Sequence, residues 1–197
     1  MMQPKRIATI ISATMALVVG VMASPAASLA QDSLQFDSAQ SDNLQFELTP
    51  SSQQLADCMP GASLIVNVKP TTDKKGFDTF NIKARNLPPD RSFTVFLLEQ
   101  AGSPFGAAEY IGDVSTNSRG NGQSKFNLIV SEAFSSTVVN GARVRKELNR
   151  IGVWFADPAD DDFCFGTDGG STTPFDGDGV AGVQAFNSAN TDPLPAP

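Results

Sequence analysis

The sequence predicts an all-β fold, an antiparallel β-sandwich of about seven or eight strands with one short helix in a connection. Three observations support this fold class. Apolar residues alternate with polar residues in short runs, turn-forming residues bound these runs, and phenylalanine dominates the aromatic content. With 14 Phe against one Trp and one Tyr, the chain has suitable side chains for a core between two sheets.

Five runs show the two-residue period of a strand, in which successive side chains point to opposite faces. Their apolar positions are Leu64, Val66 and Val68; Phe80, Ile82 and Ala84; Phe93, Val95 and Leu97; Phe126, Leu128 and Val130; and Ile151, Val153 and Phe155. Shorter candidates lie at 108–114 and 180–186. We expect eight of these side chains to point into the core: Phe80, Ile82, Phe93, Val95, Phe126, Leu128, Val153 and Phe155.

One segment departs from this pattern and predicts the short helix. It follows the turn-forming pair Asn140-Gly141. Val144, Leu148 and Ile151 stand at the i, i+4 and i+7 positions of one helical face, and basic residues occupy positions between them. We therefore expect a helical segment in this connection between two strands.

The layout resembles the immunoglobulin-like sandwiches of secreted bacterial proteins, or a related Greek-key arrangement. The local likeness is carried by Asn86-Leu87-Pro88-Pro89, which leads into the expected strand over 92–97. This unit of a turn and a strand is widespread and covers a small part of the chain. The resemblance therefore implies a fold and brings no functional residues with it.

The N-terminal residues predict a secretory signal peptide over 1–30. Lys5 and Arg6 precede an apolar run that ends at Met22, and Ser28-Leu29-Ala30 places small residues before a cleavage site. An uncleaved membrane anchor is the alternative. After cleavage we expect a secreted, extracellular protein without membrane insertion, with the periplasm and the cell surface as alternative locations.

The rest of the chain divides into three expected segments. Residues 31–56 form a polar leader, residues 57–190 the sandwich domain and residues 191–197 a Pro-rich tail. Apolar residues alternate over 44–48, so the leader either adds an edge strand to a sheet or is a tether.

Charge and cysteine content restrict the partners and the compartment. The net charge is −7 at pH 7, and an acidic chain is a poor candidate for binding nucleic acid or anionic lipid. We therefore expect an extracellular or cell-surface ligand, which the sequence does not identify. Cys58 and Cys164 are the only cysteines, and an even count in an exported chain predicts a disulfide between them.

A cluster of carboxylates near the C-terminus is a candidate for a calcium site. No Lys or Arg occurs after Arg150, and aspartates gather in two loops. Calcium prefers carboxylate and carbonyl oxygens, and glycine-rich turns expose carbonyls. Solvated loops without any metal are the alternative, so the expected cofactor is either none or calcium. The candidate ligands are Asp157, Asp160, Asp161, Asp162, Asp176 and Asp178.

The residues for catalysis are sparse. The chain has no His, which removes the usual general base and most catalytic zinc sites. Trp154 and Tyr110 are the residues that a carbohydrate-binding module would use as stacking platforms, although a buried Trp is the other interpretation.

We therefore expect a secreted, non-enzymatic extracellular module with a binding or structural role. A calcium-dependent carbohydrate-binding module is the first alternative. A small hydrolase that uses paired Asp residues, as glycosidases do, is the second.

Overall fold

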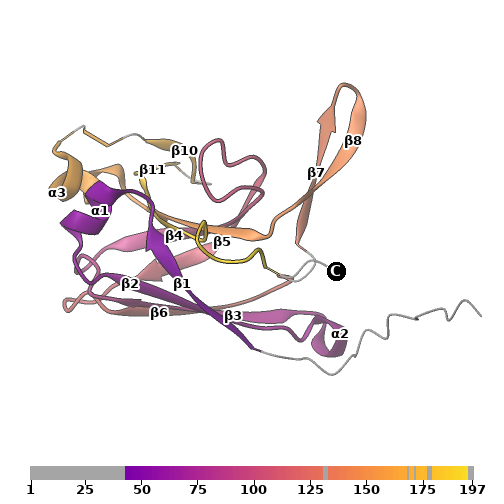
Figure 1. Ribbon diagram of the computed structural model, residues 1–197, viewed down its shortest axis with the longest axis horizontal. Coiled ribbons are helices and arrows are strands. Elements are labelled where there is room, and N and C mark those ends of the chain that lie inside the picture. Colours follow the sequence, from indigo (N-terminus) through magenta and orange to yellow (C-terminus); the bar gives the residue numbers. More distant parts are fainter. Residues whose placement is uncertain (1–42, 131–132, 168, 171, 177–178, 195–197) are drawn as a thin grey trace, which may run out of the picture. The chain divides into compact units, whose positions relative to one another are not determined.

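The computed structural model describes residues 43–130, 133–167, 169–170, 172–176 and 179–194. Its main feature is an eight-stranded antiparallel sheet that folds into two layers (Figure 1). The predicted signal peptide lies outside the described residues, as does the first part of the predicted leader. None of the helices in the described part of the chain has the length and hydropathy of a membrane-spanning segment.

The eight strands of the large sheet are β1 (Leu44–Pro50), β2 (Ser63–Lys69), β3 (Asp78–Arg85), β4 (Ser92–Leu98), β5 (Ala108–Ser115), β6 (Gly122–Leu128), β9 (Arg150–Phe155) and β12 (Gln184–Asn187). Two separate hairpins pair β7 (Phe134–Val139) with β8 (Ala142–Glu147) and β10 (Thr173–Asp176) with β11 (Gly179–Ala181). The helical segments are short: α1 (Gln53–Cys58), α2 (Thr72–Lys75), the 3-10 helix η1 (Pro158–Asp161) and α3 (Asp162–Phe165).

The strand order confirms the predicted fold class. The order in the large sheet is β5-β4-β9-β12-β1-β2-β3-β6. An isolated bridge between Thr116 and Gly122 joins the chain next to β5 to β6, and the Ser124 hydroxyl donates to the Asp113 carbonyl at 2.6 Å. The chain leaves β3, forms β4 and β5, and returns as β6 beside β3, which is a Greek-key connection. One layer is therefore β1-β2-β3-β6 and the other is β12-β9-β4-β5.

The core lies between the two layers and contains the side chains that the alternation predicts. Phe80, Ile82, Phe93, Val95, Val153 and Phe155 are fully buried, and Phe126 and Leu128 are partly buried against them. Aromatic rings meet across the core, with ring centroids 5.0 Å apart for Phe93 and Phe155 and 6.0 Å apart for Phe80 and Phe126.

The predicted leader contains a strand of the large sheet. β1 pairs with β2 from Leu44 to Leu48 and with β12 at Thr49 and Pro50, so it joins the two layers and is not an edge strand. The start of the predicted tail also packs on the domain. Leu194 is buried, and its N–H donates to the Asn149 carbonyl at 2.9 Å.

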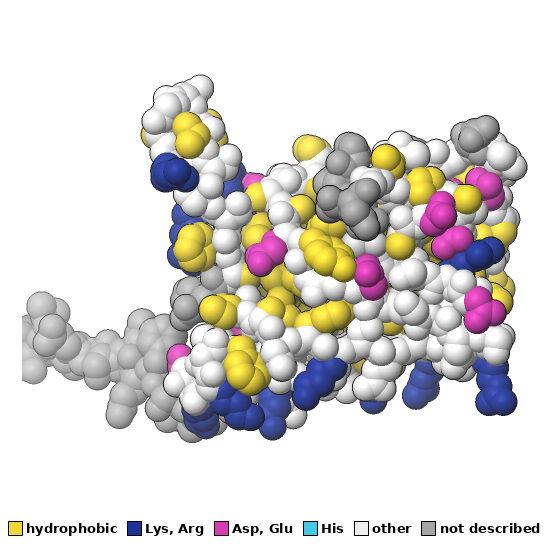
Figure 2. Space-filling view, turned by 180° about the vertical axis from the view of Figure 1, so that it is seen from behind, with side chains coloured by type: hydrophobic (Ala, Val, Ile, Leu, Met, Phe, Trp, Pro, Cys, Tyr) yellow, Lys and Arg dark blue, Asp and Glu magenta, His cyan; other side chains and the backbone are white. Residues whose placement is uncertain are grey.

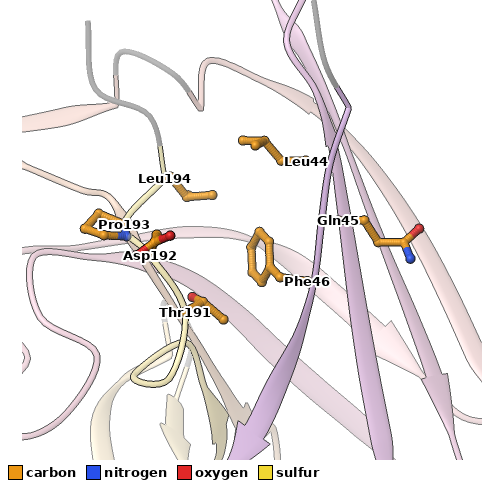
Figure 3. A pocket seen from close by; sticks show the side chains of 7 residues that line it. All are labelled: Leu44, Gln45, Phe46, Thr191, Asp192, Pro193 and Leu194. Carbon is orange, nitrogen blue, oxygen red and sulfur yellow. The ribbon is translucent and has the colours of Figure 1, made fainter.

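A small hollow separates this C-terminal segment from the start of β1. Figure 3 shows Leu44, Phe46 and Leu194 around the space, which has a volume of about 180 Å³. Its lining combines these apolar side chains with the polar residues Gln45, Thr191 and Asp192, so it is a gap at the edge of the core.

The predicted helix after Asn140-Gly141 is wrong, because this segment is the β7–β8 hairpin. Asn140 and Gly141 have φ values of 52° and 82°, and positive φ at both central residues is what a type I′ hairpin turn requires. Val144 lies in β8, whereas Leu148 and Ile151 are buried at the base of the hairpin and in β9. The helical spacing of these three residues therefore spans two different elements.

A buried carboxylate fixes the loop that contains α2. Asp78 is fully buried, and Oδ1 accepts from the backbone N–H groups of Thr71 and Thr72 and from the Thr72 hydroxyl at 2.7–2.9 Å. Oδ2 accepts from the Val130 N–H at 3.0 Å. The side chain therefore joins the β2–β3 connection to the segment that leads into β7. The alternation of apolar and polar residues in β3 did not indicate that Asp78 joins these two segments.

Candidate functional site

Three of the predicted calcium ligands have structural roles next to η1. The Asp157 carboxylate accepts from the Ala159 N–H at 2.9 Å and caps the helical turn. Asp160 forms an ion pair with Arg91, with a nitrogen–oxygen distance of 3.1 Å. Asp161 is buried and accepts from the Val183 N–H at 2.8 Å. These contacts direct the three carboxylates to different partners.

The described residues contain no group of three or more His, Cys, Asp or Glu side chains placed to hold a metal ion. Asp162 opens α3 and is half-buried. Asp176 ends β10, and Asp178 lies outside the described residues. The calcium site therefore stays a prediction, and its candidate ligands include positions whose side chains are not described.

Burial shifts the titration of two of these carboxyl groups. Desolvation raises the pKa of Asp160, the Arg91 charge opposes this shift, and the neighbouring Asp157 and Asp161 charges add to it. Desolvation also raises the pKa of Asp161, against the lowering effect of the Val183 hydrogen bond. In the folded protein both groups therefore hold a proton at a higher pH than in the unfolded chain.

The raised pKa of Asp161 contributes to the free energy of unfolding, and this contribution grows as the pH falls. We expect Asp161→Asn to remove it. A raised pKa means that the folded state binds more protons than the unfolded state. The wild-type free energy of unfolding therefore receives a favourable contribution as the pH falls from neutral toward the ordinary Asp range, and loses it as the pH rises. Asn keeps an oxygen acceptor for the Val183 N–H but does not titrate. Urea unfolding between pH 7 and about pH 4 measures the difference between the two proteins. A difference that stays constant across this range would contradict the assignment.

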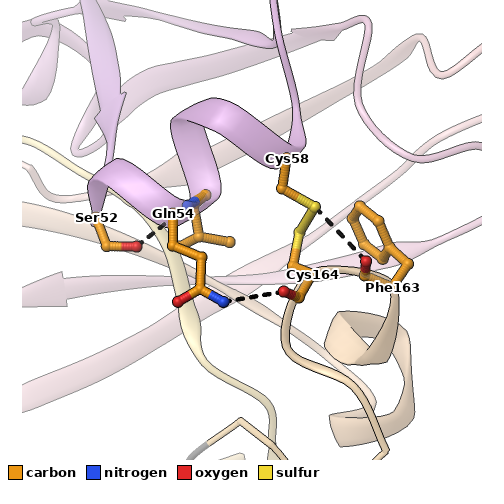
Figure 4. The surroundings of a disulfide bond; sticks show 6 residues. Ser52, Gln54, Cys58, Phe163 and Cys164 are labelled. Atoms are coloured by element: carbon orange, nitrogen blue, oxygen red, sulfur yellow. Dashed lines mark hydrogen bonds between the residues drawn. A yellow bond between two sulfur atoms is a disulfide. The ribbon is translucent and has the colours of Figure 1, made fainter.

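The predicted disulfide is present and joins α1 to α3 (Figure 4). The Cα atoms of Cys58 and Cys164 are 5.6 Å apart. Ser52 caps α1 by accepting from the Leu55 N–H at 3.2 Å. The Gln54 side chain donates to the Cys164 carbonyl at 3.0 Å, so a hydrogen bond supports the same junction as the covalent bond.

A groove of about 400 Å³ runs beside the disulfide. Its lining is mostly apolar: Cys58, Met59, Pro60, Asn86, Leu87, Pro88, Pro89, Arg91 and Phe163. Arg91 supplies the charge of this lining, and it is already paired with Asp160. Phe163 has 52% of its surface exposed, so this groove has an exposed aromatic side chain in its wall.

The two aromatic residues proposed as stacking platforms lie in different environments. Trp154 points away from the main core and is fully buried in a second, smaller cluster with Phe96, Leu98 and Ala181. Phe96 and Phe105 meet its ring edge-on, at centroid distances of 5.4 and 5.0 Å. A ligand therefore has no access to the Trp154 ring.

Tyr110 lies on the other side of Phe96 and is half-exposed, with ring centroids 5.8 Å apart. Its hydroxyl donates to Asp113 Oδ2 at 3.0 Å. Since Phe96 lies between the two rings, Tyr110 and Trp154 do not form one platform.

A polar surface forms the outer side of the layer β1-β2-β3-β6. It consists of the outward side chains of the four strands, each of which is exposed or half-exposed. We call this surface the basic sheet face. Its residues are Gln45, Glu47, Ser63, Ile65, Asn67, Lys69, Thr79, Asn81, Lys83, Arg85, Gln123, Lys125 and Asn127.

The strand register arranges these side chains in rows across the sheet. One row runs Gln45–Asn67–Asn81–Lys125, with each residue directly opposite the next. Directly opposite residues have Cβ atoms about 4.5–5.5 Å apart, so the row is a continuous strip of amides that ends in an ammonium group. The Asn67 amide donates to Gln45 Oε1 at 3.4 Å within this strip.

The charges of the basic sheet face are nearly all positive. Lys69, Lys83, Arg85 and Lys125 are exposed, and none takes part in an ion pair among the described residues. The one carboxylate, Glu47, lies at the β1 side and accepts from the Ser63 hydroxyl at 2.6 Å.

Part of the positive charge of the described residues is thus gathered on one side of the molecule, whereas Arg91, Arg145 and Lys146 form ion pairs elsewhere. In Figure 2, Lys and Arg side chains line the lower edge of the molecule, which is the side of β2, β3, β6 and α2 in Figure 1. Most of the Asp and Glu side chains in this view lie higher up. A chain with a net charge of −7 thus carries a basic surface on one layer of its sandwich.

Comparisons with protein-family models, with curated proteins and with solved structures found no match to this chain.

Proposed function

We propose that this protein is a secreted, non-enzymatic binding module, and that its basic sheet face binds an acidic polysaccharide. The observation that carries the proposal is the set of four exposed cations among amide side chains, on a sheet face whose outward side chains are exposed or half-exposed. Export is supported by the predicted signal peptide and by the disulfide.

The chemistry of the face suits a polymer with both hydroxyl and acidic groups. Lysine and arginine form charge-assisted hydrogen bonds with carboxylate or sulfate groups. Asparagine and glutamine amides both donate and accept, so they pair with sugar hydroxyls in either sense. Neighbouring strands repeat these groups about every 4.7–4.9 Å across the sheet, which allows an extended chain to make several weak contacts at once.

The same face is less suited to nucleic acid or to a membrane. Single-stranded nucleic acids stack their bases on aromatic side chains, and the described residues of the basic sheet face include no aromatic residue. Peripheral membrane binding buries an apolar surface in the lipid interface, whereas Ile65 is the only large apolar residue of this face. Cations without either feature favour a hydrophilic polyanion.

Binding is best measured with defined polymers. We expect the wild-type protein to bind polygalacturonate or a sulfated glycan in isothermal titration calorimetry, and to ignore neutral dextran. The affinity should fall as salt is added, because salt screens contacts between exposed charges.

Lys83→Glu combined with Lys125→Glu should weaken binding by about tenfold or more, since each reversal replaces attraction by repulsion.

A matched control is Arg119→Glu combined with Arg143→Glu. These residues are also exposed, lie outside the basic sheet face and change the net charge by the same amount. We expect this control to bind almost as well as the wild type. Equal losses in both double variants would point to net charge alone and would contradict a site on the face.

Measurements with calcium and with EDTA separate this proposal from a calcium-dependent module, since the basic sheet face should bind the polymer equally in both.

A further inference from the structure

The β7–β8 hairpin projects from the sandwich as an arm (Figure 1). From Ser136 to Arg145 every residue is exposed, and Val138 leaves 58% of its surface in solvent. The base of the arm is fixed by an ion pair between Lys146 and Glu99, with a nitrogen–oxygen distance of 2.8 Å. A two-stranded hairpin with two wet faces is marginally stable in water, so this arm is expected to gain a partner.

The two edges of the arm differ in their protection against strand pairing. β8 carries Arg143, Arg145, Lys146 and Glu147, and charged side chains are a common means by which proteins prevent pairing at a sheet edge. β7 reads Phe-Ser-Ser-Thr-Val-Val, without a charge, a proline or a glycine. Within the described residues β7 pairs only with β8. The free edge of β7 is therefore an open template for another strand.

The backbone directions of β7 identify the groups that would pair. At the base of the arm the Leu148 N–H donates to the Ala133 carbonyl at 2.9 Å. Hydrogen-bonded and non-bonded positions alternate along an antiparallel pair. The N–H and C=O groups of Phe134, Ser136 and Val138 consequently point away from β8, toward the free edge.

The polarity of this edge is symmetric about Ser136. Two apolar residues, Ala133 and Phe134, precede a group of three hydroxyl residues, and Val138 and Val139 follow it. If two copies of this edge pair antiparallel about Ser136, each Phe134 lies opposite Val138 of the other copy, and each Ser135 lies opposite Thr137. An aromatic residue opposite a β-branched residue is a favourable cross-strand pair, and so are two hydroxyl residues opposite each other. The same register pairs Ser136 with itself and brings together the outward N–H and C=O groups.

We infer that the occupant of the β7 edge is a second copy of this chain, and that two arms join across a two-fold axis at Ser136 into a four-stranded sheet. Pairing through β8 would instead bring arginines of one copy next to those of the other, because Arg143 and Arg145 flank Val144. A two-fold axis uses the same patch on both subunits, which the symmetric polarity of β7 supplies. This inference does not rest on the polysaccharide proposal.

The first test is the association state of the mature, oxidised protein. We expect sedimentation velocity to show a reversible monomer–dimer equilibrium between about 1 µM and 1 mM, because a contact made by one strand pair is smaller than a standard protein interface. A protein that stays monomeric over the whole range would overturn the inference, and so would a wild-type dimer that the β7 variants below leave unchanged.

Ser136→Pro tests the edge itself. Position 136 points its N–H away from β8, so proline removes the donor on the two-fold axis without removing a bond of the hairpin. We expect the dissociation constant of the dimer to rise by about tenfold or more. Arg143→Pro is the matched control, since position 143 presents its N–H on the opposite edge of the arm. An equal effect of the two prolines would overturn the assignment to β7.

Ser136→Cys traps a weak dimer. Hydrogen-bonded antiparallel partners have Cα atoms about 5.5 Å apart, within the range of a disulfide. Mild oxidation should link this variant into a covalent dimer faster than it links Arg143→Cys, with the Cys58–Cys164 bond intact in both. Equal rates of cross-linking in the two variants would overturn the proposed pairing.

Discussion

Val153→Asp is expected to abolish folding. Val153 is fully buried in β9, opposite Val95 of β4 and Phe186 of β12. An aspartate there would place a carboxylate among apolar side chains, and burying an ionised carboxylate without a partner costs more than a typical domain has in total stability. We expect the variant to lose its β-type far-ultraviolet circular dichroism and its cooperative thermal transition.

Val138→Asp is the matched control for this experiment. It makes the same chemical change at a valine of the arm, where the side chain is largely exposed. We expect this variant to fold and to melt within a few degrees of the wild type, since exposed substitutions change stability by about 0.5 kcal/mol or less. A folded Val153→Asp protein would show that the side chain of residue 153 does not point into the core between the two layers.

Removal of the disulfide is expected to produce the largest loss of stability that still allows folding. The bond spans a sequence separation of 106 residues, and the chain-entropy model assigns roughly 4–5 kcal/mol to the constraint that a loop of this length places on the unfolded chain. The double variant Cys58→Ala, Cys164→Ala should lose a large part of its free energy of unfolding, which for a domain is about 5–15 kcal/mol.

Urea unfolding measures this loss, and reduction of the wild type provides an independent comparison. Adding a reductant should destabilise the wild type by a similar amount and leave the double variant unchanged. The slope of the unfolding free energy against urea should also rise, because an uncrosslinked chain exposes more surface when it unfolds. If the double variant and the oxidised wild type have the same urea midpoint, the constraint does not contribute to stability.

The alternation of the sequence was sufficient to predict the sandwich and its core. Residues such as Phe80, Phe93 and Val153 are buried as expected because a strand with one face on a core must alternate. The helix expected after Asn140-Gly141 was wrong because three apolar residues matched a helical spacing by coincidence. The Asn-Gly pair is itself a strong hairpin signal, and it indicated the correct structure.

The candidate surfaces depended on information that alternation does not contain. The polar partners of the core residues, among them Asn67, Asn81 and Lys83, were visible as outward positions, but only the strand register aligns them in rows. The net charge of the chain does not reveal the positive charge of the basic sheet face, because it adds these cations to the aspartates near η1. Of the two interpretations of Trp154, the buried one is confirmed. The side chains that cover it include Phe105 and Ala181, which lie in other parts of the sequence.

The basic sheet face makes the surface charge of the molecule asymmetric across its sandwich. Lys69, Lys83, Arg85 and Lys125 lie on the outer side of one layer. Asp157, Asp160 and Asp162 follow β9 of the other layer. At low ionic strength the net negative charge of the chain repels an approaching polyanion, while the positive charge of the basic sheet face turns that face toward the polyanion. Salt screens both effects beyond about 8–10 Å, so the encounter rate should pass through a maximum at intermediate salt, and the molecule should arrive already oriented.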